Sequence, residues 1–171
     1  TLSTGKAPYP FRFQGIDDTS LKVKKRIFEY RLKYNGHNDQ FVVCYCLNNL
    51  FEIYNSDGSL HKRIIAPYPY LVDTNHLSAD KLGVPIDELI FTFKDCCLTD
   101  DRIFLLYNGS SPTGMIGAQS KIYVFDYEGN PIKYYLLDRY AHSFCIDKQG
   151  GVIYALSDEN DQKQVVRYSM L

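Results

Sequence analysis

Polar side chains that could bind a ligand gather in three segments of the sequence. The segments supply carboxylate, amide, hydroxyl and imidazole groups, and their members are Asp73, Asn75 and His76, then Ser110, Ser111 and Thr113, then Asp158, Glu159 and Asp161. Oxygen-rich sets of this kind suit a sugar, a peptide or calcium. Their spacing does not match an EF-hand loop, so solvated loop residues are the simpler interpretation.

His142 is the candidate for acid–base chemistry, and it lies near Arg139 and Tyr140. An imidazole at this place could act as a general base, but it would need an orienting acid and a nucleophile. The sequence contains no G-x-S-x-G, HExxH or P-loop motif that would supply them. We therefore interpret His142 as structural or solvent-facing, and keep it with Arg139 as a ligand-binding candidate.

The five cysteines are the remaining reactive groups, at Cys44, Cys46, Cys96, Cys97 and Cys145. Their number is odd, so at least one thiol is free within one chain. Zinc sites need C-x₂₋₄-C spacing repeated twice, and the chain has neither this nor a CxxC pair. The cysteines are therefore interpreted as small apolar strand residues, because free cysteine is often buried.

The composition excludes several classes of protein. The chain has 171 residues, 45% of them hydrophobic, and a formal net charge of −1. This balance argues against a nucleic-acid partner, an anionic membrane surface and a disordered tail, and no apolar run is long enough to cross a membrane. The chain has 15 tyrosines and 10 phenylalanines but no tryptophan. Such an aromatic content favours β-strands, where flat rings pack well.

Two segments of the chain repeat one β-hairpin pattern. Residues 50–59 and residues 121–130 each consist of an apolar strand that ends in an aromatic residue, followed by Asn or Asp, any residue, an acid and glycine. The acid–glycine pair favours a tight turn, so residues 60–65 and 132–137 are predicted to be return strands. A third copy of the leading strand ends at Tyr168.

A buried strand and one further strand precede each copy, so the predicted unit is four antiparallel strands. About 43 residues separate Phe125 from Tyr168, close to the roughly 40 to 50 residues of a propeller blade. The predicted fold is all-β, a partial β-propeller of about three four-stranded antiparallel blades. The blades cover about 26–66, 89–138 and 141–171, and the last lacks its outer strand.

Residues 1–25 are predicted to form an irregular N-terminal segment, and Phe11 to Gln14 could be an edge strand. Residues 26–171 then form the partial propeller. Three blades are fewer than the roughly four of the smallest closed propellers. We therefore expect either a homodimer that closes the ring or a missing N-terminal half. The chain begins at Thr1 without a signal sequence, which predicts a processed or truncated product.

The hairpin pattern also carries a family resemblance. The segments concerned are Arg102 to Asn108, Lys121 to Lys133, Leu136 to Asp138, Ser143 to Asp147, Val152 to Ser157 and Val165 to Tyr168. Together they resemble the C-terminal blades of the TolB-like six-bladed β-propellers of Bacteroides-type bacteria. This resemblance implies an exported protein, periplasmic or at the cell surface, with no assigned activity. The chain departs from the family in spanning about half a six-blade chain and in lacking the N-terminal cysteine for lipid attachment.

Propeller topology assigns the loops to two rims. The tight turns fall on one rim and the long connections, including Asp158 to Gln162, on the other, and long loops on a rigid scaffold commonly carry function. The leading hypothesis is a non-enzymatic binding module without a cofactor, whose long-loop rim contacts a protein or a glycan. The alternative is a calcium-dependent propeller hydrolase, lactonase-like or glycosidase-like, with Asp158, Glu159 and Asp161 holding the metal.

Overall fold

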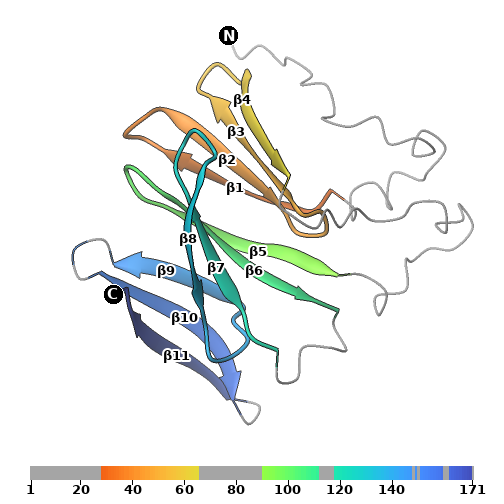
Figure 1. The fold of residues 1–171 in the computed structure, drawn as a ribbon, viewed down its shortest axis with the longest axis vertical. Helices are drawn as coiled ribbons and strands as arrows, with labels where there is room; N and C mark the ends of the chain where they lie inside the picture. The colour runs from red at the N-terminus through yellow and green to blue at the C-terminus, as the bar shows by residue number, and fades with distance from the viewer. Residues whose placement is uncertain are drawn as a thin grey trace, which may run out of the picture.

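A computed structural model describes residues 28–65, 90–111, 118–147, 149, 151–159 and 162–170 of the chain. These residues form strands and turns without a helix, and the strands build three antiparallel sheets stacked one on the next (Figure 1). The predicted all-β partial propeller is thereby confirmed. The segment Phe11 to Gln14 lies outside the described residues.

Each sheet is one propeller blade with its strands in chain order. The first blade consists of β1 (Tyr30–Asn35), β2 (Gln40–Tyr45), β3 (Leu50–Asn55) and β4 (Leu60–Ile65). The second consists of β5 (Phe91–Leu98), β6 (Ile103–Ser110), β7 (Lys121–Phe125) and β8 (Pro131–Leu136). The third has three strands, β9 (Ser143–Asp147), β10 (Val152–Glu159) and β11 (Gln162–Ser169).

One sequence expectation about the third blade is wrong. The segment from Asp158 to Gln162 was expected to be a long loop, but β10 runs to Glu159 and β11 begins at Gln162. The β10–β11 ladder extends to the pairs Asp158–Lys163 and Glu159–Gln162, so most of the expected loop is strand. Ser110 likewise belongs to strand β6 and not to a loop.

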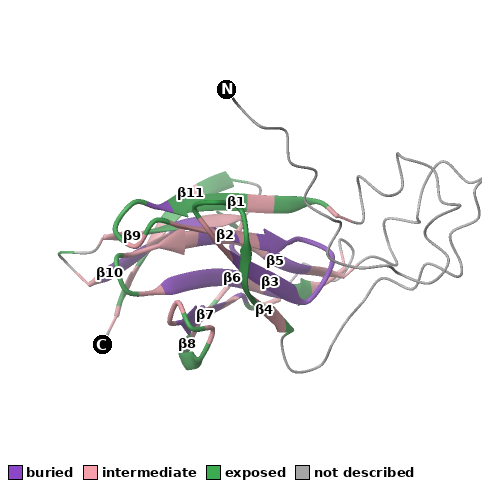
Figure 2. Cartoon of the chain, turned by 90° about the horizontal axis from the view of Figure 1, so that it is seen from above, coloured by how far each residue is buried: buried purple, intermediate pink, exposed green. Residues whose placement is uncertain are grey.

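Side-chain alternation gives each blade two faces and places a core on each side of the second blade. Phe51 and Ile53 of β3 pack with Phe93 and Phe125 of the second blade. On the other face, Phe104, Leu106, Ile122 and Val124 pack with Phe144, Ile153 and Ala155 of the third blade. Figure 2 shows the consequence, since the buried residues concentrate in the inner strands and the exposed ones in β1, β4, β8 and β11.

Hydrogen bonds join the first two blades at both rims. At the tight-turn rim, the Asn35 side-chain amide donates to the Thr99 carbonyl (3.0 Å) and contacts the Tyr127 hydroxyl (2.6 Å), which itself donates to Thr99 (3.0 Å). At the other rim, the Thr92 backbone N–H donates to the Cys46 carbonyl (2.8 Å). The blades are therefore fixed to each other at two separated points.

The cysteines are all free thiols, and their burial differs. Cys44 and Cys96 belong to the core between the first two blades, as expected of small apolar strand residues. Cys46 is also buried and Cys97 is half-buried, but Cys145 is exposed. Cys145 departs from the expectation because it lies opposite Tyr154 on β10, on the face of the third blade that the second blade does not cover.

The two repeated hairpins turn through glycines with positive φ. Gly58 has φ 83° and Gly129 has φ 78°, and their N–H groups donate to the Asn55 and Asp126 carbonyls. The two positions differ in their surroundings. A Cβ on Gly58 would meet nothing within 4 Å, whereas a Cβ on Gly129 would lie 2.7 Å from Cγ1 of Ile64 in the neighbouring blade.

The two glycines form a matched pair for mutation. Both Gly58→Ala and Gly129→Ala should lower the free energy of unfolding by about 1 kcal/mol through the left-handed backbone. Gly129→Ala should cost about 1 kcal/mol more, because Ile64 must move. Chemical denaturation of the two variants measures the difference. Equal losses would show that the β7–β8 turn does not press against the first blade.

Candidate functional site

Predicted site residues that the structure describes lie at the rim opposite the tight turns. Ser110 ends β6, Ser111 follows it, Arg139 and His142 lie between β8 and β9, and Asp158 is near the end of β10. Asp73, Asn75, His76, Thr113 and Asp161 lie outside the described residues, as does the side chain of Glu159. The described candidates therefore share one rim, but sharing a rim does not bring all of them into contact.

His142 and Asp158 form the one close pair among these described candidates. The Nε2 atom of His142 lies 2.7 Å from Oδ2 of Asp158, and the backbone N–H of His142 donates to the Leu156 carbonyl (2.8 Å). The Asp158 carboxylate therefore lies where an acid that orients the His142 imidazole would have to lie, a pairing that no sequence motif indicated. The neighbouring Ser157 hydroxyl is buried and donates to the Tyr140 carbonyl, so it is already engaged.

A buried polar network positions the segment that carries His142. The Ser120 hydroxyl donates to Oδ1 of Asn108 (2.7 Å) and accepts from the Ala141 N–H (2.8 Å). The Asn108 amide in turn donates to the Ala141 carbonyl (3.2 Å). Because these groups are buried and satisfy one another, the network is structural.

Arg139 binds Asp138, whereas His142 binds Asp158. Its guanidinium donates to both carboxylate oxygens of Asp138 at 3.1 Å, and Asp138 also accepts from the Tyr168 hydroxyl. The hydrogen bonds from Arg139 and then Tyr168 lower the pKa of Asp138. Asp138 therefore ties the β8–β9 connection to Tyr168 of β11, and Arg139 supports that carboxylate.

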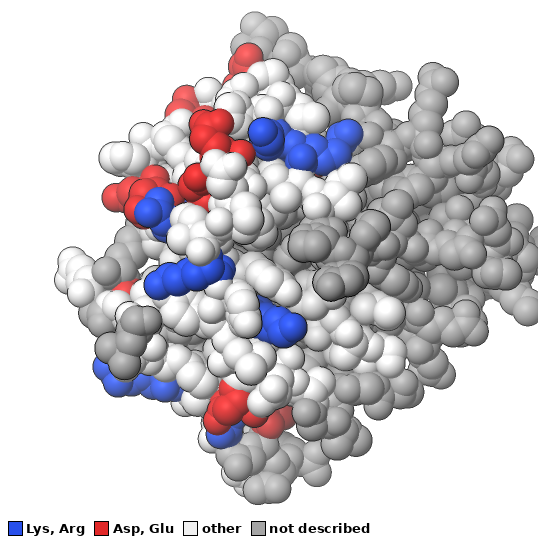
Figure 3. Space-filling model, in the orientation of Figure 1, with Lys and Arg blue, Asp and Glu red and all other residues white. Residues whose placement is uncertain are grey.

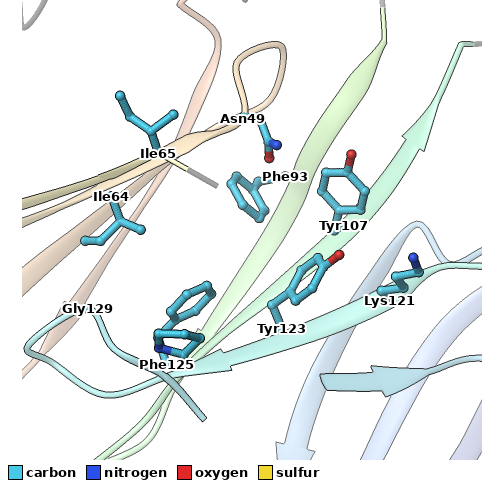
Figure 4. A pocket seen from close by; sticks show the side chains of 10 residues that line it. Asn49, Ile64, Ile65, Phe93, Tyr107, Lys121, Tyr123, Phe125 and Gly129 are labelled. Carbon is cyan, nitrogen blue, oxygen red and sulfur yellow. The ribbon is translucent and has the colours of Figure 1, made fainter. Parts of the chain in front are cut away.

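A groove between the first two blades is a second candidate site, and it was not predicted from the sequence. Its volume is about 360 Å³, within the range of small ligand pockets. The described residues that line it are Asn49, Ile64, Ile65, Phe93, Tyr107, Lys121, Tyr123, Phe125, Gly129 and Pro131. Figure 4 shows side chains from β4 on one side facing those from β5, β6 and β7 on the other.

Aromatic rings form a continuous row along this groove. Phe93 contacts Tyr107 (5.7 Å between centroids), Tyr107 contacts Tyr123 (5.5 Å), and Tyr123 contacts Tyr134 (6.1 Å). The inner end of the row packs on Phe51 in the core (6.1 Å). The rings are therefore held in place from the core to the surface.

Exposed apolar side chains border the groove. Tyr134 is 61% exposed, Leu136 54% and Ile65 50%. Tyr134 lies opposite Tyr123 and Leu136 opposite Lys121 in the β7–β8 register, so both share the groove face of the second blade. We call Tyr134, Leu136 and Ile65 the apolar border. Exposed apolar surface next to a groove is typical of an interaction site.

Separate blades supply the two walls, which explains why sequence analysis missed the groove. Tyr107 and Tyr123 each belong to an apolar strand whose sequence resembles that of any buried strand. Ile64 belongs to a different blade. The signal available in the sequence was the set of tyrosines on three successive strands, Tyr107, Tyr123 and Tyr134. Their common face becomes apparent only once the strand register is known.

A second polar cluster surrounds the fully buried carboxylate of Glu52 on the other face of the first blade. It accepts from the Tyr45 hydroxyl (2.8 Å), the Tyr54 hydroxyl (2.8 Å) and Nε of Arg63 (2.6 Å). Burial, and then the hydrogen bond to Glu52, raises the pKa of Tyr54 to about 12 and that of Tyr45 further. These partners satisfy the carboxylate, so the cluster stabilises β2, β3 and β4.

Lysine, arginine, aspartate and glutamate side chains are interspersed over the face drawn in Figure 3, so this face carries charges of both signs.

No helix among the described residues is long and apolar enough to cross a membrane. Within the same residues, no group of three or more His, Cys, Asp or Glu side chains is arranged to hold a metal ion. The calcium alternative remains a prediction, since Asp161 and the Glu159 side chain are not described.

The Glu52 cluster predicts a fall in stability at alkaline pH. A tyrosine has an ordinary pKa of about 10, and Tyr54 is raised to about 12 in the fold. Its contribution is therefore complete below pH 10 and lost as the pH rises toward 12. Chemical denaturation between pH 9 and 12 should show this fall. Tyr54→Phe should make it shallower, and an unchanged slope would contradict the role of Tyr54.

Comparison with known proteins gives a family. The model of the family described as TolB-like 6-blade propeller-like matches residues 4–149, which is most of the chain. The match begins earlier than the resemblance seen in the sequence and ends before β10. No curated protein matches the chain. The three stacked blades of the chain agree with the family match. The chain therefore belongs to the TolB-like six-bladed propeller family.

Proposed function

We propose that the protein is a non-enzymatic interaction module that binds a protein partner in the groove between its first two blades. The propeller-like fold suggests at most a binding or interaction role, and the groove supports a finer proposal. The observation that carries it is an apolar groove of about 360 Å³ bordered by exposed Tyr134, Leu136 and Ile65.

The chemistry of the walls favours a protein over a glycan. Aliphatic and aromatic side chains dominate the lining, and Asn49, Lys121 and the two tyrosine hydroxyls are its main polar groups. A sugar presents many hydroxyls that would lose water without finding partners on such walls. Apolar side chains of a protein lose little and gain about 25 cal/mol for each Å² buried.

The rim around His142 and Asp158 has less support as the principal site. Its candidates Asp73, Asn75, His76 and Thr113 are not described, and Asp158 is occupied by His142. TolB-like propellers are commonly periplasmic or exported. An exported location is therefore part of this proposal, and it is compatible with a role in protein recognition.

Selection of peptides from a displayed random library tests the proposal. We expect wild-type protein to enrich peptides with aromatic or aliphatic residues. The double variant Tyr134→Ser/Leu136→Ser should bind them at least about tenfold more weakly, because two apolar contacts of roughly 1.5–3 kcal/mol each are lost.

The matched control is Lys133→Ser on the same strand. Lys133 lies opposite Val124, on the face toward the third blade, and its Nζ lies over the Tyr135 ring. It should leave peptide binding unchanged. Selected peptides that bind the double variant as well as wild type would contradict the proposal, as would groove-dependent binding of glycans without binding of peptides.

Calcium content separates this proposal from the hydrolase alternative. The interaction module needs no metal, so the purified protein should gain no stoichiometric calcium that Asp158→Ala removes. Elemental analysis after dialysis against calcium provides the measurement. One calcium per chain, lost in Asp158→Ala together with a hydrolytic activity, would favour the alternative.

A further inference from the structure

The two ends of the groove differ in polarity. The hydroxyls of Tyr107 and Tyr123 and the Nζ of Lys121 lie toward one end, and Asn49 stands nearby across the groove (Figure 4). Ile64 and Phe125 form the other end. A ligand that fills this groove should therefore combine an apolar body with a polar head.

The Tyr107 and Tyr123 hydroxyls and the Lys121 ammonium group at the polar end can each donate hydrogen bonds. Neither the Tyr107 nor the Tyr123 hydroxyl has a hydrogen-bond partner among the described residues, and Lys121 has no ion pair there. Burial raises the pKa of both tyrosines, so both keep their protons at neutral pH. Two hydroxyls and one ammonium group toward the same end of the groove suit an anion with several acceptor positions, and a carboxylate is such an anion.

We propose that the groove receives the C-terminal residue of the protein partner, with its apolar side chain toward Phe125 and Ile64 and its carboxylate at Lys121, Tyr107 and Tyr123. This inference rests on the proposed function and names the part of the partner that is bound. Charge complementarity between Lys121 and the carboxylate carries it, together with the apolar volume beside that charge.

A chain end fits these walls better than a chain that passes through. A continuing peptide would bring N–H and C=O groups on both sides of the bound residue, and each needs a partner when it is buried. The apolar walls offer few such partners. A terminal residue brings peptide groups on one side only and ends in one carboxylate, which the donors of Lys121, Tyr107 and Tyr123 can satisfy.

The probe is the peptide Gly-Ser-Gly-Leu-Trp as a free acid, compared with the same peptide as a C-terminal carboxamide. The protein has no Trp, so fluorescence anisotropy of the peptide reports binding without background. We expect the acid to bind about tenfold or more tightly than the amide, because a charge-assisted contact is lost in the amide.

Three variants locate the carboxylate. Lys121→Met should weaken binding of the acid about tenfold and leave the amide unchanged, whereas Lys121→Arg should retain the preference. Tyr107→Phe/Tyr123→Phe removes the hydroxyls but keeps the rings, and should weaken the acid alone. Lys163→Met, on β11 away from the groove, is the matched control and should bind like wild type.

The outcomes separate this inference from the proposed function. Equal binding of acid and amide, lost in Tyr134→Ser/Leu136→Ser, would overturn recognition of a chain end and leave the interaction module intact. The same holds if neither form of this peptide binds while library-selected internal segments do. If no peptide of any kind binds in the groove, both proposals fail together.

Discussion

Aromatic packing between the first two blades is the interaction on which the described structure most depends. Phe51 of β3 lies against Phe125 (4.8 Å between centroids) and Phe93 (6.1 Å) of the second blade, and these rings belong to one core with Val42, Cys44 and Ile53. Each such ring pair adds roughly 0.5–1.5 kcal/mol to the burial of its area. Hydrogen bonds at the two rims then fix the angle between the blades.

The groove is the outer continuation of that same interface. Near the centre the rings of both blades meet, but farther out the first blade presents the aliphatic Ile64 and Ile65 opposite the tyrosines of β6 and β7. Planar rings on one wall and branched chains on the other leave a space that neither blade fills. The stability of the blade interface and the shape of the binding site therefore come from one row of aromatic side chains.

The sequence predicts the fold well because its signals are local. The Asn-x-acid-Gly and Asp-x-acid-Gly turns place the hairpins: the return strand predicted at residues 60–65 is β4 (Leu60–Ile65), and the one predicted at 132–137 is β8 (Pro131–Leu136). The site is less predictable because it depends on pairings between distant residues. Asp158 was expected in a loop but lies in β10 opposite Lys163. Its contact with His142 depends on the strand register. The groove that Tyr107, Tyr123 and Ile64 line depends on how the blades stack.

Photo-cross-linking gives the position of a bound ligand directly. A peptide whose C-terminal residue is benzoylphenylalanine is irradiated with the full chain, and the attached residues are identified by mass spectrometry. Binding between the first two blades predicts cross-links to groove residues such as Ile64, Tyr123 and Phe125. Cross-links at the rim around His142 and Asp158, with none in the groove, would contradict it.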